Sequence, residues 1–156
     1  MAVETKTCGN CTKCCEGYLK DNYSLYNGNE LVSNKACKFS NKNVGCQIYK
    51  IRPTVCKEYN CFYITNTDIP KQFKPDIIEN LITERFDTVT NCKYICILPA
   101  GKQINSELLI WLKEYFTLGK IDNIVYKENN EIVVLSTNKE FTKRINTIKH
   151  YLLNSL

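Results

Sequence analysis

The chain has 156 residues, a hydrophobic fraction of 44% and a formal net charge of +5. This is the composition of one globular domain or two small ones, and it excludes a disordered chain. No stretch approaches the roughly 20 apolar residues that a membrane helix needs, and residues 1–7 lack the apolar core of a secretory signal. We therefore expect a cytoplasmic protein with no membrane partner.

Eight of the ten cysteines fall within residues 8–61. In a reducing compartment, clustered thiols are more often metal ligands or redox groups than disulfides. A secreted, disulfide-stapled protein is the alternative, but it is disfavoured by the ligand-like spacings and the absence of an export signal. The predicted metal ligands are Cys8, Cys11, Cys14, Cys15, Cys37, Cys46, Cys56 and Cys61.

The first cysteine cluster reads CGNCTKCC over residues 8–15. A C-x-x-C pair forms a chelating turn whose two sulfurs can converge on one ion. Cys14 and Cys15 are adjacent, so their side chains tend to project in different directions and do not easily serve one tetrahedral ion. The cluster therefore supplies two sites, or one site and one core position.

Residues 21–43 are rich in Asn, Ser and Gly and show neither helical nor strand periodicity. Such a segment cannot form a core unaided, and small domains often use metal ions for this purpose. We expect an irregular N-terminal region that is organised by metal.

The second cluster brings the total to eight thiols, the number that two closed four-cysteine sites require. The single histidine, His150, lies far along the chain, so histidine ligation is not expected. An all-thiolate set favours Zn²⁺ or iron–sulfur over Mg²⁺ and Ca²⁺, and it disfavours a hydrolytic zinc held by histidines.

The net charge could indicate a nucleic-acid partner. Most of it lies in residues 1–61, which carry nine Lys/Arg against five Asp/Glu. Eight thiolates binding two divalent ions would lower the charge of the whole chain from +5 to about +1. The lysines then compensate buried thiolate charge, and the nucleic-acid hypothesis is weakened but stays open.

The rest of the chain, residues 64–156, has the alternating patterns of an α+β section with antiparallel hairpins and two amphipathic helices. We expect it to pack as one unit against the cysteine-rich domain, residues 1–63. Cys92 and Cys96, about 13 Å apart on one strand, are predicted to pack in the core. The predicted elements are a short helix within 70–81, strands at 82–89 and 94–98, a helix from Ser106 to about 118 ended by Gly119, a hairpin of 121–126 and 131–135 around Asn129–Asn130, and a helix at 139–153.

The cysteine motifs resemble those of the YkgJ-like zinc- or iron-chelating proteins, which share a domain with flagellin lysine methylases. The first family motif is C-x-x-C-G-x-C-C, and this chain has Thr12 where Gly is usual. The second matches CKF and GCQIYKIRPTVCKEYNCFY, with Tyr63 in the position of a Trp. The resemblance covers residues 8–63.

This resemblance implies metal chelation but no particular reaction. A methylase activity is not carried over, because no strand followed by a Gly-rich loop is present to hold S-adenosylmethionine. Two zinc ions are the expected cofactor, since eight thiols divide into two tetrahedral sites. A [4Fe-4S] cluster or iron is the alternative, because Cys8, Cys11 and Cys14 match the opening of a ferredoxin run and the related methylases are associated with such a cluster.

The sequence thus favours a binding protein over an enzyme, with metal ions and a possible protein partner. An iron–sulfur enzyme or enzyme accessory and a zinc-dependent nucleic-acid-associated protein are the competing hypotheses. The role of Arg52–Pro53 is also open, between anion binding and a structural turn in which Arg52 screens thiolate charge.

Overall fold

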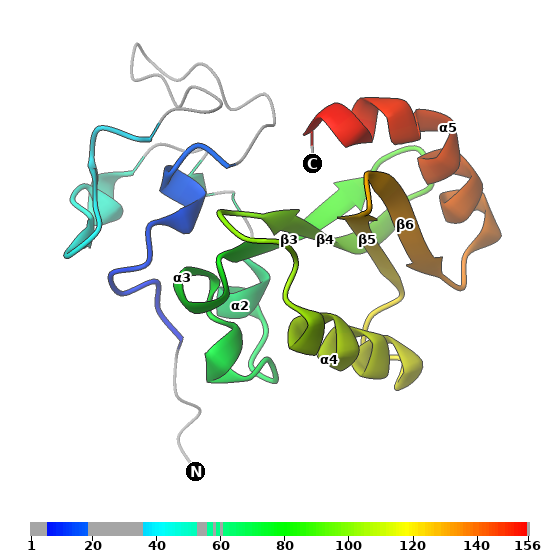
Figure 1. Ribbon diagram of the computed structural model, residues 1–156, viewed down its shortest axis with the longest axis horizontal. Helices are drawn as coiled ribbons and strands as arrows, with labels where there is room; N and C mark the ends of the chain where they lie inside the picture. Colours follow the sequence, from blue (N-terminus) through cyan, green and yellow to red (C-terminus); the bar gives the residue numbers. More distant parts are fainter. Residues whose placement is uncertain (1–5, 19–35, 53–55, 58, 60, 156) are drawn as a thin grey trace.

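The structure is a computed structural model that describes residues 6–18, 36–52, 56–57, 59 and 61–155. The predicted α+β class is confirmed: helices cover a four-stranded sheet, and short elements make up the described cysteine-rich residues (Figure 1). Our prediction for residues 21–43 falls largely on residues 19–35, and the predicted turn at Pro53 falls on residue 53. Both lie outside the described residues.

The sheet has the order β3-β4-β5-β6. Both hairpins, β3–β4 and β5–β6, are antiparallel, whereas the central pair β4–β5 is parallel. A parallel pair needs a crossover, and helix α4 (Ser106–Thr117) supplies it between β4 and β5. The strands are β3 (Asn80–Asp87), β4 (Cys92–Pro99), β5 (Asn123–Glu128) and β6 (Glu131–Ser136).

The sheet is buried on both faces, because successive residues of a strand point to opposite sides. One face carries Ile82, Ile97 and Tyr126 and packs against α4. The other face packs against α5 (Lys139–Ser155) through Phe141 and Ile145. Figure 1 shows the two helices on opposite sides of the sheet. Cys96 is buried on the α5 face and Cys92 packs beside it, so the predicted core role of both residues is confirmed.

The short helix predicted within residues 70–81 is confirmed as a single helical turn, α3 (Pro75–Ile78), which Pro75 begins. A 3-10 turn η3 (Lys71–Phe73) precedes it, and strand β3 then begins at Asn80. Pro75 forces Lys74 into an extended conformation, and Glu79 adopts a left-handed conformation that ends the helix.

The other predicted elements are confirmed within a few residues of their ends. Asn129 and Asn130 both have positive φ in the β5–β6 turn, as their tolerance of that conformation predicts. The helix predicted to start with Ser106 as its cap instead uses Asn105, whose side chain accepts a hydrogen bond from the Leu108 N–H at 2.9 Å.

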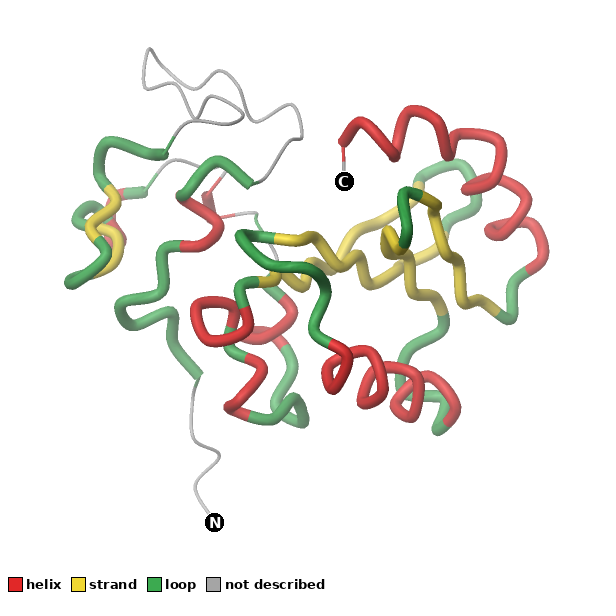
Figure 2. Tube along the Cα trace, in the orientation of Figure 1, coloured by secondary structure: helices red, strands yellow, loops and turns green. Residues whose placement is uncertain are grey.

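The cysteine-rich residues contain only short elements, which Figure 2 shows as small turns and strands joined by long loops. None of the helices in the described parts of the chain combines the length and apolar character needed to cross a bilayer. The short elements are η1 (Lys13–Cys15), β1 (Ser40–Asn41), β2 (Gly45–Cys46), η2 (Tyr49–Ile51) and α2 (Phe62–Thr65).

Asn80 is a buried polar residue that fastens the start of β3 to the loop before α4. Its side-chain amide donates to the carbonyls of Lys102 at 3.3 Å and Gln103 at 3.2 Å. Its side-chain oxygen accepts from the Asn105 N–H at 2.8 Å. Since Asn105 caps α4, one side chain fixes both the strand and the helix start.

Replacing this side chain tests its role. Asn80→Ala leaves buried backbone groups without partners, so we expect the free energy of unfolding to fall by about 1–3 kcal/mol. Urea denaturation followed by circular dichroism measures the change. Asn146→Ala on the exposed face of α5 is the control and should change stability by less than about 0.5 kcal/mol. Equal stability of the two variants would contradict this role for Asn80.

Candidate metal centre

The first two predicted ligands lie on a tight turn. The Cys11 N–H donates to the Cys8 carbonyl at 2.9 Å, and Gly9 between them has a φ of +53°. Both thiols of this closed turn are half-buried, and a turn of this kind is typical of chelating C-x-x-C pairs. Lys74 lies beside the turn, with its ammonium 3.5 Å from the Asn10 side-chain oxygen.

The next two cysteines lie on η1. At the start of this turn, the Cys15 N–H donates to the Thr12 carbonyl at 2.7 Å. The sulfurs of Cys14 and Cys15 are 3.9 Å apart. Thr12 is buried, and its hydroxyl donates to a Glu16 carboxylate oxygen at 2.8 Å. A glycine at this position, as in the family motif, would lack this bond.

Cys37 and Cys46 are joined through the small hairpin of β1 and β2. The Cys37 N–H donates to the Cys15 carbonyl at 2.7 Å, which ties the second cluster to the first. The Cys37 carbonyl in turn accepts from the Ser40 N–H at 3.0 Å, and Ser40 is the strand partner of Cys46. Backbone hydrogen bonds therefore connect Cys15, Cys37 and Cys46.

Cys61 lies at the edge of the large sheet. It forms an isolated antiparallel bridge with Thr83 of β3 and caps the start of α2. Its side chain packs against the same hydrophobic cluster as α4, whereas Cys14 packs against the cluster on the α5 face. The two thiols thus approach β3 from either side of its free edge.

Burial and neighbouring cysteines together raise the pKa values of Cys56 and Cys61. Burial, followed by the nearby charges of Cys15, Cys37 and Cys46, raises the pKa of Cys56 to about 11. Burial also raises the pKa of Cys61 to about 11, with Cys8 and Cys11 adding to the rise and the N–H groups of Ile64 and Tyr63 opposing it. The pKa of Cys56 and the pKa of Cys61 are therefore raised by different neighbouring cysteines.

Three more thiols have raised pKa values and one has a lowered pKa. Burial is the main cause at Cys8 and Cys11. The hydrogen bond between Cys14 and Cys15 raises the pKa of Cys14 and lowers that of Cys15. At neutral pH most of these thiols are protonated, and a bound cation would favour their thiolate forms.

The donor chemistry of these residues suits a soft cation, because eight half-buried thiols without disulfides lie in one region of the chain. Their present arrangement is looser than a coordination shell. Within the described ranges, no three His, Cys, Asp or Glu side chains are placed so that they could hold a metal ion. Coordination would therefore require the sulfurs to move closer together.

Arg52 lies beside the thiols, with its guanidinium 4.0 Å from the centre of the Tyr49 ring. The hydrogen bond with Tyr49 raises the pKa of Arg52, and the charges of Cys8 and Cys46 act in the same direction. This position fits the structural interpretation of Arg52, in which it screens thiolate charge. Of the aromatic residues near the cysteines, Phe62 and Tyr63 are buried, but Tyr49 is 46% exposed.

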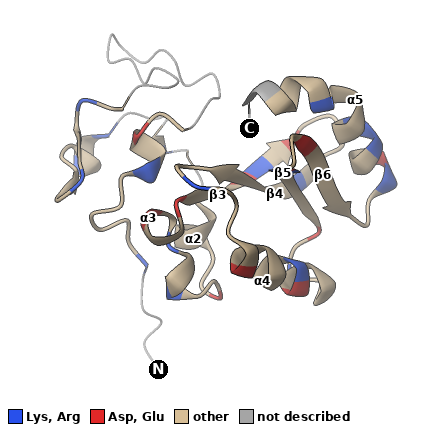
Figure 3. Ribbon diagram, viewed as in Figure 1, with Lys and Arg blue, Asp and Glu red and all other residues tan. Residues whose placement is uncertain are grey.

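A set of ion pairs joins the cysteine-rich residues to the sheet, and no local pattern in the chain predicts it. Lys13 pairs with Glu16 at 3.1 Å and with Glu79 at 3.5 Å, and Glu79 also pairs with Lys102 at 2.9 Å. Lys13 belongs to the lysines that motivated the nucleic-acid hypothesis, yet it is nearly buried among acids. Figure 3 shows basic and acidic positions together on α4, whereas most charged positions of α5 are basic.

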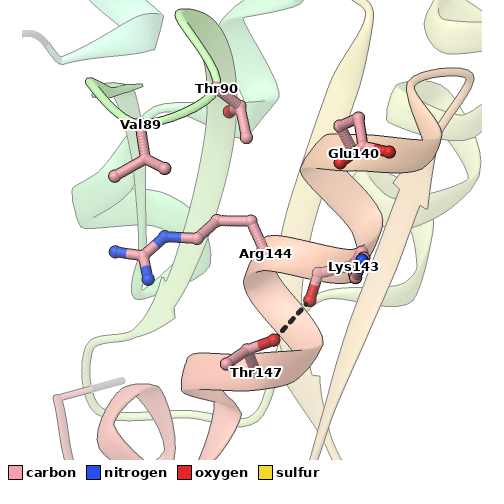
Figure 4. A pocket seen from close by; sticks show the side chains of 6 residues that line it. All are labelled: Val89, Thr90, Glu140, Lys143, Arg144 and Thr147. Carbon is pink, nitrogen blue, oxygen red and sulfur yellow. Dashed lines mark hydrogen bonds between the residues drawn. The ribbon is translucent and has the colours of Figure 1, made fainter.

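A hollow of about 470 Å³ lies between the β3–β4 turn and α5, and none of its lining residues belongs to the two cysteine clusters (Figure 4). Arg144 reaches into it from α5 and pairs with Asp87 at 3.6 Å. The residues around it provide one acid, two bases, two hydroxyls and an apolar group, and they do not form a grouping typical of catalysis. They are Val89, Thr90, Glu140, Lys143, Arg144 and Thr147.

No family model, curated protein or solved structure matches this chain. The interpretation of the cysteines therefore depends on their spacing, their chemistry and the geometry above.

Gly45 offers a test of how the two cysteine clusters pack. Its φ is +90°, and a side chain there would collide with the Gly9 carbonyl oxygen. Gly119 also has positive φ, at +67°, but open space surrounds it. Both alanine variants are strained, by about 1 kcal/mol or more, and we expect Gly45→Ala to be the less stable because it also separates the clusters.

Thermal unfolding of the two variants measures this difference, and we expect the lower melting temperature for Gly45→Ala. If Gly119→Ala is destabilised as much, the close approach of Gly45 to Gly9 does not contribute to stability.

The lowered pKa of Asp87 predicts that the stability of the fold depends on pH. Burial alone would raise its pKa, but hydrogen bonds from Thr90 and the charge of Arg144 outweigh burial and hold the pKa below the usual 3.8. A lowered pKa stabilises the fold above the unfolded-state pKa, and this contribution is lost as the pH falls through the folded-state value. Asp87→Asn should therefore lower the free energy of unfolding at neutral pH by about 1 kcal/mol.

Urea titrations of this variant and the wild type at neutral and strongly acidic pH measure the effect. The difference between them should shrink in acid, where Asp87 is protonated in the wild type. Glu114→Gln on the exposed surface of α4 is the control and should leave stability unchanged at both pH values. A pH-independent difference for Asp87→Asn would contradict the role of its charge.

Proposed function

We propose that the chain is a metal-binding protein in which eight cysteine thiolates hold zinc, with two ions that are mainly structural and a role in binding or metal handling. The observation that carries the proposal is the gathering of the two cysteine clusters. The Cys37 N–H donates to the Cys15 carbonyl at 2.7 Å, and Cys61 bridges to Thr83 on the same strand, β3, against which η1 with Cys14 and Cys15 lies. Residues far apart in the sequence thus place their thiols in one region.

The lack of an apolar core in the cysteine-rich region supports this proposal. Among the described residues 36–52, 56–57 and 59, none belongs to the buried hydrophobic clusters. Val44 and Ile51 are exposed. Bound metal would supply the free energy of folding that burial does not, as it does in small zinc domains.

The resemblance to the YkgJ-like chelating proteins supports the same proposal through the order of the eight cysteines and the I-Y-x-x-R-P motif. The ten free thiols favour a reducing compartment, which supports a cytoplasmic location.

An iron–sulfur cluster is the second candidate, and one observation favours it. Cys8, Cys11 and Cys14 have ferredoxin-like spacing, and Cys61 lies close enough for its charge to affect Cys14. A run of three cysteines with a distant fourth is a known cluster ligand set. With such a cluster the chain would be an enzyme or enzyme accessory.

Elemental analysis of anaerobically purified protein, together with its visible spectrum, separates the two candidates. About two zinc ions per chain without colour supports the structural sites. Iron with acid-labile sulfide and a broad brown absorption supports the cluster. Protein that contains neither metal and binds neither on reconstitution would rule out both.

Serine substitutions test the ligands. Cys11→Ser and Cys56→Ser should each reduce the metal content and unfold part of the cysteine-rich region, because a hydroxyl is a poor ligand for these ions. Metal analysis and near-ultraviolet circular dichroism give the readouts. Cys92→Ser is the control and should keep full metal content, since that thiol hydrogen-bonds to Thr90 and Asn138 and packs against the cluster on the α5 face. If both serine variants stay fully folded and keep their full metal content, the proposal is contradicted.

A further inference from the structure

Strand β6 forms the second edge of the four-stranded sheet, opposite to β3. In the described part of the chain its only strand partner is β5, whereas β3 also carries the bridge from Cys61. Helix α5 lies over one face of the sheet. Asn138, which precedes the helix, contacts Cys92 of β4, and near the end of the helix the Leu153 carbonyl accepts from Lys127 of β5. The helix thus runs over β4 and β5 and packs on a face of the sheet rather than along the outer edge of β6.

The turn between β5 and β6 determines which backbone groups of β6 point away from the sheet. Asn129 and Asn130 both have positive φ and form a two-residue turn. The residues on either side of it, Glu128 and Glu131, are paired, and in a hairpin of this kind that pair is hydrogen-bonded. Hydrogen-bonded and non-hydrogen-bonded pairs alternate along an antiparallel ladder. The residues whose N–H and C=O groups point outward are therefore Ile132, Val134 and Ser136.

These outward groups have no backbone partner among the described residues. The backbone hydrogen bonds found there outside the regular helices and strands include none from Ile132, Val134 or Ser136. Proteins usually protect such an edge with lysine, proline, a bulge or a very short strand. Strand β6 has six residues, EIVVLS, and pairs with β5 without a break in register, so it has none of these features.

The side chains of β6 are apolar on both faces of the sheet. Val133 and Leu135 pack against the cluster on the α4 face, and Ile132 and Val134 pack against the cluster on the α5 face. All four are only partly buried. A strand added at this edge with the same apolar pattern would extend both rows and bury them further.

The strand is complementary to a second copy of itself. When two sheets join edge to edge about a two-fold axis, opposite residues must lie on the same face, and a shift by one residue would break this match. Pairing Val134 with Val134 of the second copy satisfies the condition. It sets Ile132 opposite Ser136, and Val133 opposite Leu135. All three outward-pointing residues then form hydrogen-bonded pairs, each of which exchanges two backbone bonds.

The charges near the ends of β6 fit the same pairing. Glu131 is the only charged residue of the strand, and it is exposed. The pairing places it opposite Thr137 of the second copy, two residues before the exposed Lys139 of that copy. The two Glu131 side chains lie at opposite ends of the paired segment, about 20 Å apart, since a strand rises about 3.4 Å per residue. Each acid therefore meets a basic end, and the two acids are largely screened from each other.

We propose that β6 pairs with β6 of a second copy and forms a two-fold dimer with a continuous sheet, four strands from each copy. The other edge of each sheet carries the bridge between Cys61 and Thr83, with η1 against the same strand, so the assembly closes at two copies. A single pair of strands is a small interface, and we therefore expect a dimer that dissociates on dilution.

Sedimentation equilibrium of the full-length chain measures this association. A reducing agent is included so that no disulfide joins two copies. We expect the mass to rise from the 18.1 kDa of one chain to twice that value as the concentration increases from about 1 μM to about 1 mM. A monomer at every concentration, or growth beyond two copies, would overturn the proposal.

Amide hydrogen exchange followed by NMR locates the interface without any substitution. The N–H groups of Ile132, Val134 and Ser136 should exchange at least about tenfold more slowly at dimer than at monomer concentration. Those of Val133 and Leu135 are bonded to β5 within each copy and should exchange equally slowly at both concentrations. A dimer that leaves the three outward groups unprotected uses another surface, and this outcome would also overturn the proposal.

A pair of charge variants tests the two-fold axis. Residue 134 faces its own copy there, so Val134→Lys and Val134→Glu each place like charges opposite one another and should be monomeric. An equimolar mixture of the two variants should dimerise again, because the introduced lysine then faces the introduced glutamate. Loss of folding would not be rescued in this way. Ile110→Lys, at an exposed position of α4, is the control and should dimerise like the wild type.

Two results of this experiment would contradict the proposed pairing. One is a dimer formed by either Val134 variant alone, and the other is a mixture of the two folded variants that stays monomeric. Far-ultraviolet circular dichroism of each variant establishes that it is folded. If neither variant folds, the hydrogen-exchange measurement on the unchanged chain still decides the question.

Discussion

The free edge of strand β3 is the constraint on which the arrangement of the molecule depends. An edge strand exposes unpaired backbone groups, and proteins usually cover or shorten such edges. Here the cysteine-rich residues cover it: Cys61 pairs with Thr83, and η1 lies against the same strand. The edge that would otherwise be open is the surface on which the candidate metal centre is assembled.

Charged groups reinforce this attachment. Glu79 immediately precedes β3 and pairs with Lys13 from η1 and with Lys102 after β4. Lys6 donates to three backbone carbonyls of residues 66–69, at 2.6–3.0 Å. Half-buried ion pairs of this kind contribute more to orientation than to stability. They orient the thiol-bearing segments against the sheet, where Cys61 and Cys14 pack on its two hydrophobic clusters.

Much of the sheet section could be predicted from the sequence because its signals are local. Asn129–Asn130 indicated a hairpin, and the apolar spacing of residues 139–153 indicated a helix against the sheet. The limits of the short helix expected within residues 70–81 are local as well, since Pro75 restricts the residue before it and Glu79 ends it in a left-handed conformation.

The candidate site could be predicted only as a set of residues. Spacing identifies C-x-x-C pairs, but the approach of Cys61 to Cys8 and Cys14 depends on β3 and α2 being in place. The pairing of Lys13 with Glu79 is equally long-range, at a separation of 66 residues. The parallel contact between β4 and β5 likewise has no local signal, because it follows from how the crossover through α4 packs.

The adjacent pair Cys14–Cys15 joins the sheet to the second cysteine cluster. The two sulfurs lie 3.9 Å apart, yet the other contacts of the residues differ: Cys14 packs against the cluster on the α5 face, whereas the Cys15 carbonyl accepts a hydrogen bond from the Cys37 N–H. The hydrogen bond between the two thiols lowers the pKa of Cys15 while raising that of Cys14. A single turn that lies against β3 therefore carries one thiol that packs on the sheet and one residue that holds the second cluster.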